Sequence, residues 1–173
     1  MAFVNRRWGE LIAFIVLSCS SLQARGATDI AVFDFELIDT SLDGEMLGKK
    51  PAEQERLAKL SRQLRDALAA KSYNVVDIAP VAEKAAASNL QNCGGCDATF
   101  AREAGASLAI TGTVQKVSNL ILNINLYVRD VQSGKPLAAM SADIRSNTDE
   151  SWSRGLSWLV RNRLLKTLET TAP

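Results

Sequence analysis

Hydrophobic and polar residues alternate along three consecutive stretches in the second half of the chain, and a period of two is typical of half-buried β-strands. Short turn sequences separate the stretches: Ser118 and Asn119 after the first, and a Ser-Gly turn after the second. We therefore predict an antiparallel meander of three strands, over residues 107–117, 120–131 and 136–145.

The first half of the chain contains two further stretches that predict strands, over residues 29–37 and 73–78. A helical segment separates them, so we expect the pair to be parallel and joined by a right-handed crossover. If residues 29–37 form one regular strand, Phe33, Phe35 and Leu37 lie on one side of it, and Ile30, Val32, Asp34 and Glu36 lie on the other.

Four segments have the spacing of helices. Leucines recur at helical intervals after Pro51 and predict a helix over residues 51–71, after a polar loop over residues 38–50. Residues 80–90 and 97–105 predict two shorter helices. A closing helix starts near Asn147 and Glu150, which resemble a capping box. Its apolar positions are Trp152, Leu156, Leu159, Val160, Leu164 and Leu168.

The predicted order of elements is β-α-β-α-α-β-β-β-α. Such an order defines an α/β fold with a mixed sheet, arranged as a two- or three-layer sandwich. The segment after residue 26 has the length of one ordinary domain. We therefore predict a single α/β domain over residues 27–173.

The amino-terminal residues predict export. Arg6 and Arg7 precede an apolar run over residues 11–22, which is too short to cross a bilayer, and small residues end at Gly26. We expect residues 1–26 to be a cleaved signal peptide and the protein to be periplasmic. Ser18 before Cys19 also fits a lipoprotein processing site, so the alternative is a membrane-anchored lipoprotein lipidated at Cys19.

Composition excludes several classes of function. The chain has 20 Lys and Arg against 19 Asp and Glu, a balance that removes the usual electrostatic argument for nucleic-acid binding. It contains no His, so it cannot assemble a Ser-His-Asp relay or a His-ligated metal site. We expect no cofactor, no metal site and no nucleic-acid partner, and a membrane contact only if Cys19 is lipidated.

Cys93 and Cys96, separated by two glycines, form the sharpest motif in the chain. In an oxidising compartment we expect them to form a disulfide. Three interpretations remain open: a local structural cross-link, a redox-active dithiol, and half of a metal site shared across a dimer.

Asp34 and Glu36 form a second candidate site. They stand near the carboxyl end of the first predicted strand, where open parallel sheets place their ligands. With Asp39 and Asp43 they provide carboxylates for a cation or for acid-base chemistry. Solvated carboxylates that cap nearby helices are the alternative.

Two surfaces are candidates for binding a partner. The polar side of the meander carries Asn123, Asn125, Tyr127 and Arg129, whose amides and guanidinium hydrogen-bond in fixed directions. Alternatively, this side is solvated or is covered by the closing helix. The closing helix carries the aromatic and basic stripe Arg154, Trp158 and Arg161. This stripe either packs Arg stems over Trp or docks an acidic partner or lipid headgroups.

Short motifs carry two resemblances. Residues 111–114 and 127–131, followed by a Ser-Gly turn, resemble consecutive strands in the amino-terminal domain of TolB and in curli-secretion and penicillin-binding-protein-activator lipoproteins. This resemblance implies a shared fold. A longer resemblance links the chain to a bacterial family of exported proteins of unknown function, some of them encoded near quinoprotein alcohol dehydrogenases. It is carried by residues 31–45, 93–98, 111–123 and 147–165.

These observations predict an exported accessory protein that binds another periplasmic or envelope protein and is not itself an enzyme. The first alternative is a thiol-disulfide redox protein that uses Cys93 and Cys96. The second, implied by the family resemblance, is a ligand- or cofactor-binding accessory to a quinoprotein dehydrogenase. The identity of the partner and the oligomeric state remain open.

Overall fold

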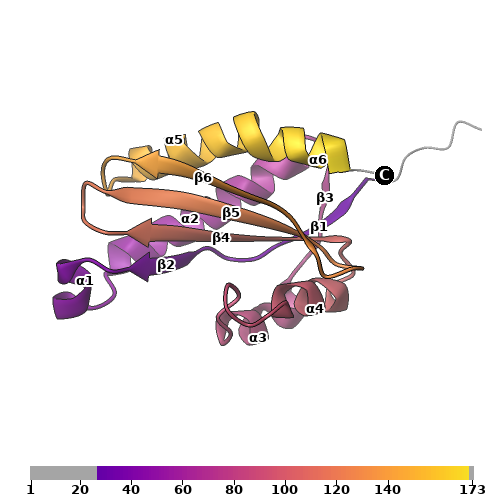
Figure 1. Ribbon diagram of the computed structural model, residues 1–173, viewed down its shortest axis with the longest axis horizontal. Coiled ribbons are helices and arrows are strands. Elements are labelled where there is room, and N and C mark those ends of the chain that lie inside the picture. The colour runs from indigo at the N-terminus through magenta and orange to yellow at the C-terminus, as the bar shows by residue number, and fades with distance from the viewer. Residues whose placement is uncertain (1–26, 172–173) are drawn as a thin grey trace, which may run out of the picture.

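The computed structural model describes residues 27–171, and its centre is a mixed sheet (Figure 1). The strand order is β3-β1-β4-β5-β6, and β2 pairs with β4 beyond the end of β1. The pairs β1–β3, β1–β4 and β2–β4 are parallel, and β4–β5–β6 is antiparallel. The predicted α/β class and meander are thereby confirmed. The strands are β1 (Asp29–Val32), β2 (Glu36–Asp39), β3 (Asn74–Val75), β4 (Leu108–Lys116), β5 (Leu122–Asp130) and β6 (Pro136–Ile144).

Helices cover the two faces of this sheet unequally (Figure 1). One face lies against α2, α5 and α6, while α3 and α4 lie on the other face, near the end of the sheet where β1 begins. The helices are α1 (Leu42–Leu47), α2 (Pro51–Ala69), α3 (Ala82–Ala86), α4 (Cys96–Glu103), α5 (Asp149–Leu159) and α6 (Leu165–Thr171), with a 3₁₀ turn at Ala79–Val81 and a π-helical turn at Val160–Leu164.

The larger core lies between the sheet and α2, α5 and α6. The leucine stripe of α2 and the apolar positions predicted for the closing helix are buried here against Ile110, Ile124 and Leu126. The buried positions of the closing helix are mostly four residues apart, and the π turn between α5 and α6 helps to keep them on one side. The periodicity therefore identified the core correctly, although it did not predict the π turn.

The predicted strand over residues 29–37 is two strands. Val32 pairs with Ile110, and Glu36 pairs with Thr113. Between these two pairs, the segment from β1 to β2 contains one residue more than β4 does. An extra residue reverses the alternation of side chains. Phe35 consequently lies in the larger core with Val32, not on the side of Phe33 as the alternation predicted.

The space for Phe35 depends on a glycine opposite it. A Cβ at Gly112 would lie 2.4 Å from the Phe35 ring, so only glycine fits there without displacing the ring. The N–H of Phe35, removed from the strand ladder, donates to the buried Ser61 Oγ at 3.0 Å. The break is thus supported from both the sheet and α2.

Further boundaries differ from the prediction, including the strand predicted over residues 73–78, which is limited to Asn74–Val75. The loop over residues 38–50 contains α1, whose cap Ser41 accepts a hydrogen bond from the Gly44 N–H at 3.1 Å. The helix predicted over residues 80–90 is limited to a 3₁₀ turn and α3. The cap of α5 is Thr148, not Asn147, because the Thr148 hydroxyl accepts from the Ser151 N–H.

The smaller core leaves part of the second face open. It gathers Ala31, Phe33, Ala109 and Val131 beneath α3 and α4, at one end of the sheet. Beyond it, the described helices leave this face of the sheet uncovered (Figure 1), and Asn123, Asn125 and Tyr127 of β5 are partly or fully exposed there. The fold therefore has three layers over one part of the sheet and two layers over the rest.

Candidate functional site

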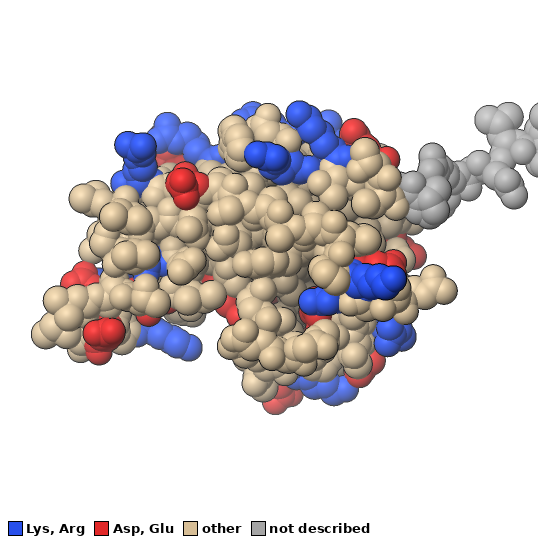
Figure 2. Space-filling view, viewed as in Figure 1, with Lys and Arg blue, Asp and Glu red and all other residues tan. Residues whose placement is uncertain are grey.

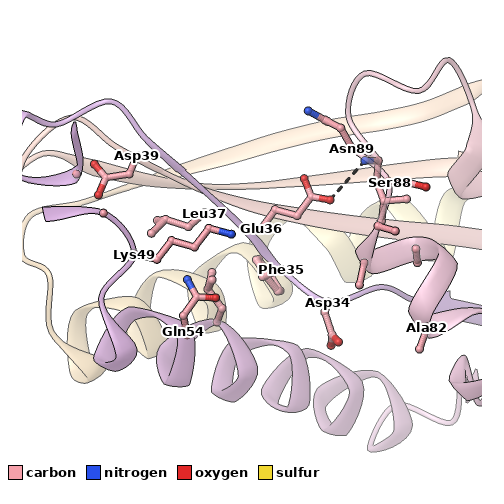
Figure 3. Close-up of a pocket in the computed structure, with 17 residues that line it drawn as sticks. Asp34, Phe35, Glu36, Leu37, Asp39, Lys49, Gln54, Ala82, Ser88 and Asn89 are labelled. Carbon is pink, nitrogen blue, oxygen red and sulfur yellow. Dashed lines mark hydrogen bonds between the residues drawn. The ribbon is translucent and has the colours of Figure 1, made fainter. Parts of the chain in front are cut away.

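A cavity of about 680 Å³ lies between α1, the start of α2, and the segment from α3 to Leu90. Figure 2 shows the molecular surface hollowed between the part that contains α1 and the part that contains α3. Asp34 and Glu36 both line the cavity but point to different elements, as Figure 3 shows. Asp34 accepts from Arg65 Nη2 at 2.7 Å, whereas Glu36 accepts from the Leu90 N–H at 3.4 Å.

The expected pairing of Asp34 with Glu36 on one face is therefore not found, because the break between β1 and β2 separates them. Burial raises the pKa of Glu36, and the hydrogen bond from Leu90 offsets part of this increase. Asp39 lines the same cavity, but Ser41 and Lys116 already occupy its carboxylate. Within residues 27–171 no group of three or more Cys, Asp or Glu side chains is arranged to hold a metal ion.

Cys93 and Cys96 form the expected disulfide, with their Cα atoms 5.6 Å apart. Gly94 and Gly95 both have positive φ, of 70° and 112°, which lets the chain turn tightly into α4. The Cys96 N–H at the start of α4 points to Cys93 Sγ. The cross-link thus fixes where α4 begins, and with it the position of Asp97.

Replacing Cys93 and Cys96 together with Ser is expected to lower the free energy of unfolding by about 2 kcal/mol. The expected loss is small because the loop that the disulfide closes is very short. Urea unfolding of the oxidised protein and of the variant measures this difference. Reductant should bring the wild type to the stability of the variant. Equal stabilities for oxidised wild type and variant would contradict a structural role for the cross-link.

The residues predicted for the polar side of the meander lie together on one side of the sheet. Asn123, Asn125, Tyr127 and Arg129 lie on one side of β5, and the closing helix lies on the other side of the sheet. Asn125 Nδ2 donates to Asn123 Oδ1 at 3.0 Å and to Thr113 Oγ1 at 3.3 Å. These contacts fix the orientation of the amides, and we call these four residues of β5 the open polar face.

A groove of about 400 Å³ adjoins the open polar face, between the start of α4 and the strands β4, β5 and β6. Tyr127 and Leu137, both more than one-third exposed, line it. Arg129 crosses its floor, where Nε lies 2.8 Å from Asp97 Oδ2 and Nη1 donates to the Gly134 carbonyl at 2.8 Å. The side chain of Asp97 is 5% exposed, and its Oδ1 has no hydrogen-bond partner.

The second candidate surface lies on the opposite side of the sheet. Arg154 and Trp158 are on α5, and Arg161 is on the π turn that follows. Trp158 is 44% exposed, and Arg154 forms an exposed ion pair with Glu150 at 3.3 Å. We call Arg154, Trp158 and Arg161 the α5 stripe. The sheet separates it from the open polar face, so the two are separate surfaces.

Sequence reasoning missed a buried charge cluster at the end of β4. Lys116 is fully buried, with Nζ 2.8 Å from Glu53 Oε1 and 2.9 Å from Asp39 Oδ2. Asn147 Nδ2 also donates to Glu53 Oε1, at 2.7 Å. The cluster joins α2, β2, β4 and the segment before α5. A signal was present, because Lys116 shares its strand side with the core residue Val114.

Burial would lower the pKa of Lys116, but its hydrogen bonds to Glu53 and Asp39 reverse this effect, so the pKa is raised. Burial likewise acts to raise the pKa of Asp39, and the hydrogen bonds from Ser41 and Lys116 outweigh it, so that pKa is lowered. Both shifts favour the charged forms, so Lys116 and Asp39 form an ion pair at neutral pH.

Exposed apolar side chains also gather near one end of the molecule, at α1, the end of β2 and the β4–β5 turn. Asn119 Nδ2 donates to Asp43 Oδ2 at 3.1 Å, which connects this turn to α1. The side chains of this apolar end are Ile38, Leu42, Met46, Leu47, Val117, Leu120 and Ile121.

Over the described part of the chain, no helix combines the length and apolarity needed to traverse a bilayer. The proposed lipidation site Cys19 lies outside the described residues.

The fold is similar to that of the C-terminal domain of LpoB. The C-terminal domain of LpoB from Escherichia coli aligns with a TM-score of 0.50 at 15% identity, over 72% of this chain and 87% of that one. Lipoprotein GNA1162 from Neisseria meningitidis aligns at 0.47 and 17% identity, over 84% and 99%. TolB from Acinetobacter baumannii aligns at 0.43 and 13% identity, over 85% and 29%.

The chain belongs to the DUF3280 family, described as "Protein of unknown function (DUF2380)", whose family model matches residues 28–164. The expected membership of a family of unknown function is confirmed. No curated protein matches the chain. These comparisons bring no support for the redox or the quinoprotein-accessory alternative.

Proposed function

We propose that this protein is an exported accessory protein that acts by binding another periplasmic or envelope protein. Residues 1–26 have the order of regions found in a signal peptide, and the Cys93–Cys96 disulfide suits an oxidising compartment. Lipidation at Cys19 would anchor the same domain to a membrane. Its role in either case is recognition of a protein partner.

The open polar face supports this proposal most directly. Hydrogen bonds fix the Asn123 and Asn125 amides, and Tyr127 stands exposed beside them. Tyr is enriched in protein interfaces because it supplies a large contact area together with a hydrogen-bonding hydroxyl. An extended surface of oriented polar side chains beside an exposed aromatic ring suits a macromolecule, because such a surface offers many contacts over a large area.

Photo-crosslinking in cells of the native host tests the proposal. A photoreactive amino acid replaces Tyr127 on the open polar face, and in a control it replaces Lys71, an exposed residue after α2. We expect a discrete heavier adduct from position 127 and none from position 71. Failure to form an adduct at position 127, or the same adducts from both positions, would contradict a partner bound at the open polar face.

A further inference from the structure

The sheet ends in an unpaired strand that is long enough to bind a peptide. Among residues 27–171, β6 pairs with β5 alone over its nine residues. The Asp130 N–H donates to the Lys135 carbonyl, and Leu126 faces Met140. Since amides alternate in direction along a strand, the N–H and C=O groups of Ala139, Ser141 and Asp143 point away from β5. These backbone groups are free to pair with another strand.

The edge lacks the features that usually prevent such pairing. Proteins protect edge strands with lysines, prolines within the strand, or a covering segment. In β6 the only charged residue is Asp143, and the only proline, Pro136, stands at the first position. The middle of the strand consists of small residues and Met140, so another backbone can approach closely.

The α5 stripe runs beside this edge. Gln63 of α2 donates to Ser157 Oγ and so defines the side of α5 that faces α2. Gly155 lies on the other side, against Ile144 of β6: a Cβ on it would be 2.5 Å from the Ile144 side chain. Trp158 is three residues after Gly155 and therefore lies on the same side. An exposed aromatic ring thus stands alongside β6.

We propose that an extended, acidic segment of the partner protein adds to β6 as a further strand of the sheet. The inference rests on the proposed function and specifies the chemistry of the partner. The free backbone groups of β6 require an extended backbone as their complement. Trp158 and the half-buried Met140 meet apolar side chains on one side of the added strand, and Leu137 meets those on the other.

Charge favours a partner segment over a second copy of this chain. Two copies paired antiparallel through β6 would place both α5 stripes on one face, with two copies each of Arg154 and Arg161 close together. Like charges at that distance repel. Asp or Glu side chains flanking the apolar positions of a partner segment would instead be attracted to the same guanidinium groups.

Ser141 offers a matched pair of variants, because its N–H points outward and its side chain has no hydrogen bond within the described structure. Ser141→Pro removes the N–H that an added strand would use, at a position where an edge strand tolerates proline. Ser141→Ala keeps it. A photoreactive amino acid at position 158 then reports occupancy of the edge in host cells, and the adduct is digested to map the attached segment.

We expect the adduct at position 158 to persist in Ser141→Ala and to fall about tenfold in Ser141→Pro, the effect of losing a backbone hydrogen bond and close packing. The mapped segment should be acidic and come from a different protein. An adduct insensitive to Ser141→Pro, a cross-linked dimer of this chain, or a basic segment would overturn the proposal. An adduct at position 127 with none at 158 would overturn it while leaving the proposed function intact.

Discussion

Replacing Lys116 with Met is expected to lower the free energy of unfolding by about 3–5 kcal/mol, because it leaves buried carboxylates without their cation. Lys116 is fully buried, and Glu53 is 1% exposed. Glu53 Oε2 already lacks a partner, so after the substitution only Asn147 would hydrogen-bond this carboxylate. Chemical denaturation at neutral pH measures the loss.

The double variant Lys116→Met, Glu53→Gln is the control for this prediction. Removing one charge from each side should recover part of the loss, since the buried carboxylate of Glu53 is no longer present. If the double variant is less stable by the full sum of the two single losses, the two side chains act independently. That result would contradict an ionic cluster.

The pH dependence of the wild type follows from the same cluster. The lowered pKa of Asp39 contributes stability above about pH 4, the unfolded value, and this contribution disappears as pH falls through the folded pKa. The raised pKa of Lys116 contributes stability below about pH 10, which is lost as pH rises through its folded pKa. The cost of Lys116→Met should therefore be largest between these limits and shrink in acid.

Replacing Arg129 with Leu is expected to lower the free energy of unfolding by about 3 kcal/mol, since Asp97 is buried and Arg129 is its charged partner. The loss also frees the Gly134 carbonyl in the turn before β6. Arg129 was predicted as a residue of the partner surface. Its guanidinium makes two contacts within the protein, and we expect it to support the groove next to Tyr127.

A second substitution, at Asp97, separates the cost of leaving this carboxylate unpaired from the other effects of Arg129→Leu. Adding Asp97→Asn should restore part of the stability, because an amide costs less to bury than an unpaired carboxylate. Tyr127→Ala, in contrast, should leave stability within about 1 kcal/mol, as its side chain is more than one-third exposed. Thermal unfolding of the three variants and the wild type compares them, and a Tyr127→Ala loss as large as that of Arg129→Leu would contradict this division of roles.

Local patterns predicted most of the architecture because the core is periodic. The leucines of α2 and the alternation in β4 and β5 mark buried sides that the structure confirms. The break between β1 and β2 was not predicted, since its cause is distant in the sequence: Gly112 makes space for Phe35, and Ser61 accepts its N–H. Residues 29–37 contribute apolar side chains to both cores, so their sequence does not reveal where the alternation reverses.

The buried charge cluster was not predicted, although the same patterns contained a signal for it. Lys116 stands on the core side of β4, and Glu53 is four residues before Leu57 on the buried stripe of α2. A basic and an acidic residue on two inward sides therefore signalled a buried pair. Asp97 gave a weaker signal, since a carboxylate after Cys96 also suits an exposed helix start, and only the tertiary contact with Arg129 distinguishes the two.

Hydrogen-deuterium exchange of the protein in complex with its partner, retrieved from host envelopes through a carboxyl-terminal tag, tests most directly where the partner binds. The comparison is with the free protein. We predict that the amides of Ala139, Ser141 and Asp143, which exchange rapidly when β6 is an open edge, become protected in the complex. Unchanged exchange along β6, with protection confined to the apolar end around Leu42 and Ile121, would contradict the account.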